Sequence, residues 1–169
     1  MITISLRFPA GRFHATPWGR HVNEGAVEWP PSPWRVLRAL VAAWKRTLPG
    51  LPQVQVEPVL RALSAPPEFL LPPASTGHTR HFMPWFKKGP GDRTLVFDAF
   101  VAVPREAPLL IQWPAASLQP DQADVLGRIL ARLNTLGRSE SWCDAALCNA
   151  GEAAARPGGA GLRCAPLDG

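Results

Sequence analysis

Two segments of the sequence, residues 10–24 and 76–93, interleave basic, imidazole and aromatic side chains. This mixture suits an unpaired polynucleotide, because cationic groups neutralise phosphates while planar rings stack on exposed bases. We therefore predict an RNA-binding surface built from both segments and from the basic face of the helix between them. The candidate residues are Arg12, Phe13, His14, Trp18, Arg20, His21, Arg35, Arg38, His78, Arg80, His81, Phe82, Trp85, Lys87, Lys88 and Arg93.

The four histidines, His14, His21, His78 and His81, suggest a second chemistry. An imidazole can act as general acid or base while a ribose 2′-hydroxyl attacks its own phosphate, so a metal-independent ribonuclease is an alternative. No spacing singles out a pair of histidines, and the acidic residues are too scattered to indicate a two-metal nuclease. We therefore expect neither a catalytic residue nor a cofactor in this chain.

The cysteines Cys143, Cys148 and Cys164 are an odd number, and their spacing matches no standard zinc knuckle. We expect reduced thiols and no metal. Arg7 and Arg12 interrupt the first apolar stretch, which excludes a signal-peptide pattern. No apolar run approaches the roughly 18 residues of a membrane span. These observations predict a cytoplasmic protein without a membrane partner.

Charge is unevenly distributed along the 169 residues, whose net charge is +5. Residues 1–93 hold 12 Lys and Arg against 5 Asp and Glu, a balance of +7, whereas residues 94–169 hold 6 against 8, a balance of −2. The first part therefore suits a polyanion, and the second suits core and protein contacts. Charged residues make up only 18% against a norm of about 25%, which favours a subunit of an assembly. A basic adaptor that meets acidic proteins, or a merely solvated face at Arg35 and Arg38, is the alternative to RNA binding.

Periodicity predicts the elements that position these segments. Residues 2–8 alternate apolar with polar side chains, as in a half-buried strand. The Ser-Pro pair at 32–33 indicates the start of a helix that continues to Thr47, with Trp34 and Trp44 expected in its core-facing part.

Proline-rich sequence follows, with a helical turn expected at 57–64 and a short strand at 69–71. Residues 95–103 and 109–113 have the composition of two further strands. The basic and aromatic segments are expected to be long connections.

A second helix is expected from Pro120, with an apolar stripe that reaches Leu136 and Gly137 as its cap. Arg128 and Arg132 lie four residues apart and are expected on its outer face, where the nearby acidic residues disfavour RNA.

A small-residue tail begins near residue 149, and residues 161–167 are expected to form a weak last strand. The order β-α-β-β-α-β predicts a single α+β domain over residues 1–169 with the ferredoxin-like fold, an antiparallel sheet with its helices on one face. The RNA-recognition motif has the same architecture.

Four segments together resemble one family: LRFPAGRFHAT at 6–16, EWPPSPWRVLRALVAAWKR at 28–46, GHTRHFMPW at 77–85 and LGRSESW at 136–142. They are similar to the fused Cas-five/Cas-six subunit of type I-G (formerly I-U) CRISPR systems, a member of the RAMP superfamily of RNA-binding proteins. The resemblance covers nearly the whole chain. Members of that family are longer, and this chain corresponds to their N-terminal, Cas-five-like half.

The resemblance implies a RAMP-type domain that caps the 5′ handle of the guide RNA in a Cascade surveillance complex for antiviral defence. It implies contacts with the backbone RAMP subunit, the large subunit and the processing subunit. Processing of precursor RNA would belong to the Cas-six-like half, for which this sequence has no room.

Overall fold

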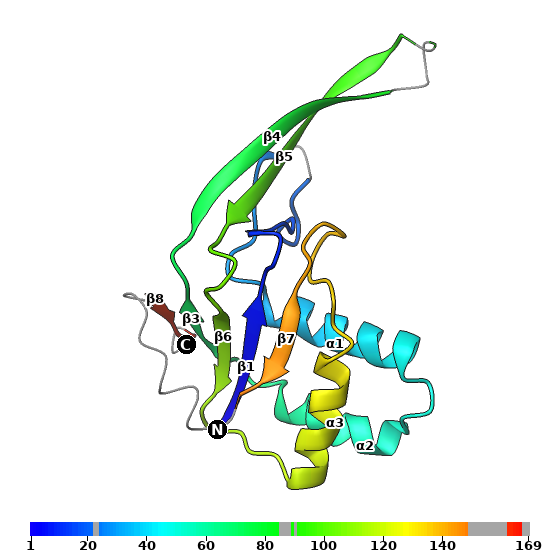
Figure 1. The fold of residues 1–169 in the computed structure, drawn as a ribbon, viewed down its shortest axis with the longest axis vertical. Helices are drawn as coiled ribbons and strands as arrows, with labels where there is room; N and C mark the ends of the chain where they lie inside the picture. Colours follow the sequence, from blue (N-terminus) through cyan, green and yellow to red (C-terminus); the bar gives the residue numbers. More distant parts are fainter. Residues whose placement is uncertain (22–23, 85–88, 90, 149–161, 167–169) are drawn as a thin grey trace.

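The computed structural model describes residues 1–21, 24–84, 89, 91–148 and 162–166. Helices pack against one face of a five-stranded sheet with the order β7-β1-β6-β3-β8, and a three-stranded sheet with the order β2-β5-β4 rises from one end of it (Figure 1). The elements are β1 (Ile2–Arg7), β2 (Arg12–Phe13), α1 (Pro33–Thr47), α2 (Gln53–Ala62), β3 (Glu68–Leu71), β4 (Ser75–Pro84), β5 (Arg93–Ala102), β6 (Leu109–Trp113), α3 (Pro120–Leu130), β7 (Asp144–Leu147) and β8 (Leu162–Cys164).

The strand order confirms the predicted ferredoxin-like class. Along the chain, β1, β3, β6 and β7 alternate with helices in the β-α-β-β-α-β sequence, and in space they lie in the order β7-β1-β6-β3. All three pairings among them are antiparallel. The first crossover contains both α1 and α2, so the expected turn at 57–64 is a complete helix over Gln53–Ala62.

Strand β1 forms the centre of the sheet because its apolar residues recur at every second position. Ile2, Ile4 and Leu6 are at most 3% exposed and belong to the core beneath the helices. Thr3 and Ser5, on the other face, are also buried. The strand is therefore buried on both faces, rather than half-buried as predicted.

Helix α1 begins and ends where the sequence predicts. The Ser32 hydroxyl accepts a hydrogen bond from the backbone N–H of Arg35 at 3.3 Å, as an N-cap does. Val36 and Trp44 lie on the buried face, whereas Trp34 is 61% exposed. The prediction of a buried Trp34 is wrong because it lies two residues before Val36, which is about 200° around the helix axis.

Helix α3 ends at Leu130, earlier than its apolar stripe suggests. Leu136 is nevertheless buried, because the turn after the helix folds back onto the core. Gly137 is not a helix cap. Its φ is +93°, and a Cβ there would lie 2.5 Å from the carbonyl oxygen of His14, so this position requires glycine for a close approach of two backbones.

Three strand predictions need correction. The fourth strand of the ferredoxin order is β7, which was not predicted, and the expected last strand forms β8 at the opposite edge, beside β3. Much of the predicted connection 76–93 is strand β4, which pairs with β5 over its full length (Figure 1). The small-residue segment 149–161 lies outside the described residues.

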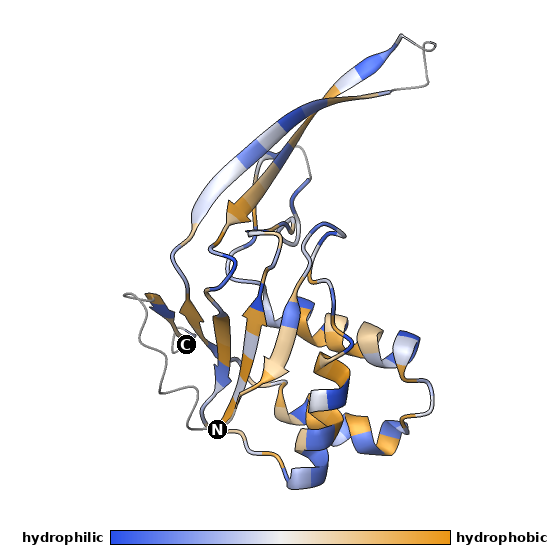
Figure 2. Cartoon of the chain, viewed as in Figure 1, coloured by the Kyte–Doolittle hydropathy of each residue, from blue (hydrophilic) through white to orange (hydrophobic). Residues whose placement is uncertain are grey.

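Hydropathy follows this architecture. Apolar residues line β1, β3 and β6, whereas hydrophilic residues occupy much of β4 (Figure 2). Within the described part of the chain, no helix combines the length and apolar character that crossing a membrane requires.

Candidate nucleic-acid interface

The antiparallel hairpin β4–β5 places four of the sixteen predicted site residues, His78, Arg80, Phe82 and Arg93, on one face. Directly paired residues share a face of a sheet, and the pairs here are His78 with Ala99, Arg80 with Phe97 and Phe82 with Leu95. We call the face formed by His78, Arg80, Phe82, Leu95 and Phe97 the hairpin platform.

Aromatic and cationic groups of the hairpin platform lie in direct contact. The His78 imidazole stacks on the Phe97 ring with centroids 4.6 Å apart, and the Arg80 guanidinium carbon lies 5.7 Å from the same ring centroid. Phe82 and Leu95 are 66% and 51% exposed. The platform therefore presents planar surfaces and a cation to solvent, the two features that single-stranded RNA requires.

Charge on this hairpin is separated between its two faces. No acidic residue occurs among the paired residues on the platform side. This side also includes Arg93, two positions before Leu95 in the sequence. The acid Asp98 lies on the opposite face, 3.7 Å from His81 Nδ1 and 3.0 Å from Arg138 Nη1. His81 is thus directed toward an ion pair and away from the platform.

The ion pairs of Asp98 continue into the body of the protein. Arg138 Nε lies 3.6 Å from Glu140 Oε1, which accepts a hydrogen bond from His14 Nδ1 at 2.7 Å. Burial opposes ionisation of Glu140, but hydrogen bonds from its own backbone N–H and from His14, with the attraction of His14 and Arg138, lower the pKa of this carboxyl. We call the five side chains His14, Asp98, His81, Arg138 and Glu140 the hairpin anchor.

Two predicted RNA contacts are corrected by burial. Phe13 is fully buried and packs against Phe8 and Trp29, with centroids 5.4 and 5.8 Å away. His14 is 6% exposed, and its backbone N–H donates to Ser141 Oγ at 2.8 Å. Phe13 lies in β2, which pairs with the inner end of β5, and His14 contacts the turn at residues 138–141.

The remaining candidates of the first segment lie at the surface. Trp18 is 82% exposed, Arg12 is half-buried in β2, and His21 is exposed. Arg20 is exposed and forms an ion pair with Glu24 at 3.4 Å. Trp85, Lys87 and Lys88 lie outside the described residues.

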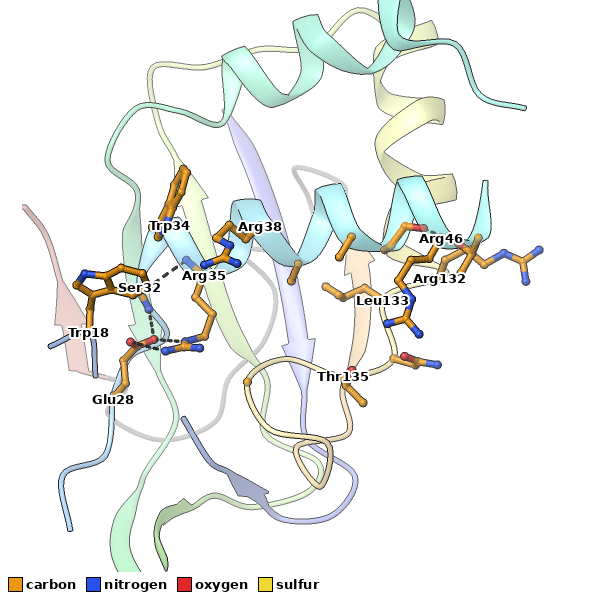
Figure 3. A pocket seen from close by; sticks show the side chains of 16 residues that line it. Trp18, Glu28, Ser32, Trp34, Arg35, Arg38, Arg46, Arg132, Leu133 and Thr135 are labelled. Atoms are coloured by element: carbon orange, nitrogen blue, oxygen red, sulfur yellow. Dashed lines mark hydrogen bonds and ion pairs between the residues drawn. The ribbon is translucent and has the colours of Figure 1, made fainter. Parts of the chain in front are cut away.

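Arg35 forms an ion pair with Glu28, which neither alternative for the basic helix face, a solvated surface or an RNA contact, includes. Its Nε and Nη2 donate to Glu28 at 2.7 and 3.1 Å (Figure 3). Nη2 also donates to the Thr16 carbonyl at 2.8 Å. Burial opposes ionisation of Glu28, but hydrogen bonds from Arg35 and from the Ser32 backbone lower its pKa. The charge of Arg35 is therefore compensated within the protein, and its contact with RNA stays a prediction. Arg38 is exposed and lines a groove instead.

No cluster of three or more His, Cys, Asp or Glu side chains that could hold a metal ion occurs within the described ranges. Cys143 is buried, and burial, with the adjacent charge of Asp144, raises its pKa to about 12. A thiol with that pKa is a poor ligand and a poor nucleophile at neutral pH.

The residues that sequence reasoning missed are Phe97 and Arg138. Phe97 lies within the predicted strand 95–103, and the signal that it belongs to the site is the alternation of His78, Arg80 and Phe82 in the partner strand. Arg138 follows Gly137, and nothing in the local sequence indicates its contact with Asp98.

These features define a ferredoxin-like α+β domain with a projecting hairpin that carries an aromatic and cationic face. No family model matches the sequence, and no curated protein matches it. Among solved structures, Thermus thermophilus Cas6 is similar, with 16% sequence identity and a TM-score of 0.39 over 86% of this chain. The chain spans about half of that protein's length, 53%.

Proposed function

We propose that this chain binds single-stranded guide RNA on its hairpin platform and caps the 5′ handle in a Cascade-type complex in the cytoplasm. The observation that carries the proposal is the arrangement at Phe97, whose ring contacts His78 and Arg80 on an exposed strand face. A base stacked there would meet a planar surface and a guanidinium together.

Electrostatics supports a polyanionic ligand at this place. The paired residues on the platform side of the hairpin include Arg80 and Arg93 and no acid. Asp98 is held on the opposite face by Arg138 at 3.0 Å. A phosphate backbone along the platform would therefore encounter attraction without a compensating carboxylate.

The choice of guide RNA and of Cascade comes from the sequence resemblance to the Cas-five-like half of the type I-G subunit. In that role the hairpin would hold the handle, while other surfaces contact the backbone, large and processing subunits. We propose binding without cleavage, because His14 is buried and His81 faces Asp98. Neither imidazole faces the platform, so the described platform residues offer His78 no second histidine to complete an acid–base pair.

The test uses the full chain and a fluorescently labelled RNA that carries the repeat-derived handle of the CRISPR array encoded with it. Arg80→Ala and His78→Ala should each lower the affinity about fivefold or more. The matched control is Arg128→Ala, which removes an exposed charge from helix α3. Equal losses in the control and the platform variants would reduce the interaction to net charge alone and contradict the proposal.

Two further outcomes identify the alternatives. Equal affinity for scrambled and handle RNA, with tighter binding to an acidic protein subunit, would make the chain a basic adaptor. Conversion of repeat RNA without metal to a product with a 2′,3′-cyclic phosphate, abolished by His78→Ala, would make it an endoribonuclease.

A further inference from the structure

A groove of about 780 Å³ runs along helix α1, on the helical side of the molecule (Figure 3). Its walls come from α1 and from the turn that follows α3. Three small side chains of α1, Ala39, Ala42 and Ala43, line it, so the helix backbone lies close to whatever occupies the groove. Its volume lies within the usual range for ligand sites.

Three arginines of this groove have no partner among the residues that the structure describes. Arg38, Arg46 and Arg132 are exposed, and none of them forms an ion pair or a side-chain hydrogen bond with another described residue. The fourth arginine, Arg35, is neutralised by Glu28 at 2.7 Å. The groove therefore has three uncompensated guanidinium groups, which are forks suited to phosphate oxygens.

Two exposed indole rings lie at one end of the same groove. Trp18 is 82% and Trp34 61% exposed, although large aromatic side chains are highly buried on average. Both line the groove near Arg38, whereas Arg46 and Arg132 lie at its other end (Figure 3). The groove thus offers planar groups with one cation at one end and two cations at the other, a combination also found in proteins that bind unpaired strands.

The spacing favours a strand over a single nucleotide. Arg38 and Arg46 are eight residues apart on α1, which corresponds to about 12 Å along the helix axis. The early end of α3 at Leu130 explains why Arg132 reaches this groove. Arg132 lies in the turn beyond the helix and lines the groove, and Arg128 does not, so the predicted common outer face of these two arginines is corrected.

We propose that this groove is a second binding site for single-stranded RNA, a few nucleotides long and separate from the hairpin platform. Arg46 and Arg132 bind phosphate, and Trp34 stacks on a base at the other end. The pair of exposed indoles favours RNA over an acidic protein segment, which supplies carboxylates but no stacking faces. The inference stands independently of the hairpin platform, because the two surfaces share no residue.

The experiment measures binding of labelled pentauridylate to the full chain in an Arg80→Ala background, which weakens the platform. The double variant Arg46→Ala with Arg132→Ala should lower affinity at least tenfold. Its log–log salt slope should become shallower by about 1.4, because each lost phosphate contact contributes about 0.7 on single strands. Arg128→Ala, which removes one exposed charge outside the groove, should stay within twofold.

Trp34→Leu supplies the second readout, because this surface position tolerates the change without loss of folding. We expect about fivefold weaker binding and loss of part of the tryptophan quenching that the probe causes. Equal affinities for the double variant and the Arg128→Ala control would overturn the site. Displacement of the probe by hexaglutamate at equal charge, with no effect of Trp34→Leu, would assign the groove to an acidic protein segment and also overturn it. If Arg80→Ala leaves the affinity for handle RNA unchanged while the groove still binds pentauridylate, the result contradicts the hairpin platform and not the groove site.

Discussion

The imidazole of His78 lies nearly parallel to the ring of Phe97, with an interplanar angle of 24° and centroids 4.6 Å apart. The two residues are diagonal neighbours across the hairpin, since His78 pairs directly with Ala99. Phe97 also packs closely against Gly25, which follows the first segment, because a Cβ at Gly25 would lie 2.7 Å from its Cε1. The central ring of the platform is therefore fixed before any ligand arrives, which reduces the ordering cost of binding.

The two histidines of β4 should differ in their effect on RNA binding. His78→Ala removes a platform surface and should weaken handle binding about fivefold or more. His81→Ala removes a side chain directed toward Asp98, so we expect less than a twofold change. Fluorescence anisotropy with handle RNA measures both. A larger loss in His81→Ala would place the RNA on the opposite face of the hairpin.

Two glycine substitutions should change stability in opposite directions. Gly137→Ala introduces a Cβ 2.5 Å from the His14 carbonyl at a φ of +93°, and we expect it to lower the free energy of unfolding by more than about 2 kcal/mol. Gly127→Ala, inside α3 with open space around it, should raise that free energy by about 0.5–1 kcal/mol. Urea denaturation followed by circular dichroism gives both values, and equal signs would contradict the geometry of the 137 turn.

Acid should weaken the link between Glu28 and Arg35. The pKa of Glu28 is lowered from its ordinary value of 4.5, so its stabilising contribution is present above that value and is lost as pH falls through the lowered pKa. Glu28→Gln should cost about 2 kcal/mol near neutral pH. The gap between wild type and variant should narrow below pH 4.5, as measured by denaturation at several pH values. A difference in unfolding free energy that widens in acid would contradict a stabilising contact between ionised Glu28 and Arg35.

Cys143 should resist alkylation in the folded protein. Its side chain is buried and its pKa is about 12, so little thiolate exists at neutral pH. Mass spectrometry after iodoacetamide treatment at pH 7.5 should find residue 143 unmodified in buffer and modified in urea. Rapid modification of Cys143 in buffer would mean that the turn after α3 opens readily.

Local periodicity was sufficient to predict the elements that bury one stripe of apolar side chains. The alternation in β1 and the Ser32 cap of α1 are signals within a few residues, and both elements lie where they were predicted. The ferredoxin-like order of elements was predicted correctly, although its last strand is β7 and not the predicted strand at residues 161–167. Strand β7 has only four residues, with two alanines and no long alternation, and it exists because it pairs with β1.

The errors in the candidate site come from contacts between distant residues. Phe13 and His14 are buried by pairing with β5 and by the turn at Glu140, more than 80 residues away along the chain. Strand β4 is mostly exposed, so it lacks the burial pattern by which strands are recognised. The ion pair of Arg35 was not predicted, because its partner Glu28 precedes the helix and lies beyond two prolines.

The hairpin anchor has a mechanical consequence. Strand β5 has ten residues and is therefore about 30 Å long at 3.3 Å per residue. Asp98 lies near the middle of β5, five residues and therefore about 16 Å from Arg93 at the outer end. A rotation of about 5° about the contact between Asp98 and Arg138 would move that outer end by roughly 1.4 Å. The hairpin therefore acts as a projecting arm, and the ion pairs of Asp98 with Arg138 and His81 determine how accurately its outer end is positioned.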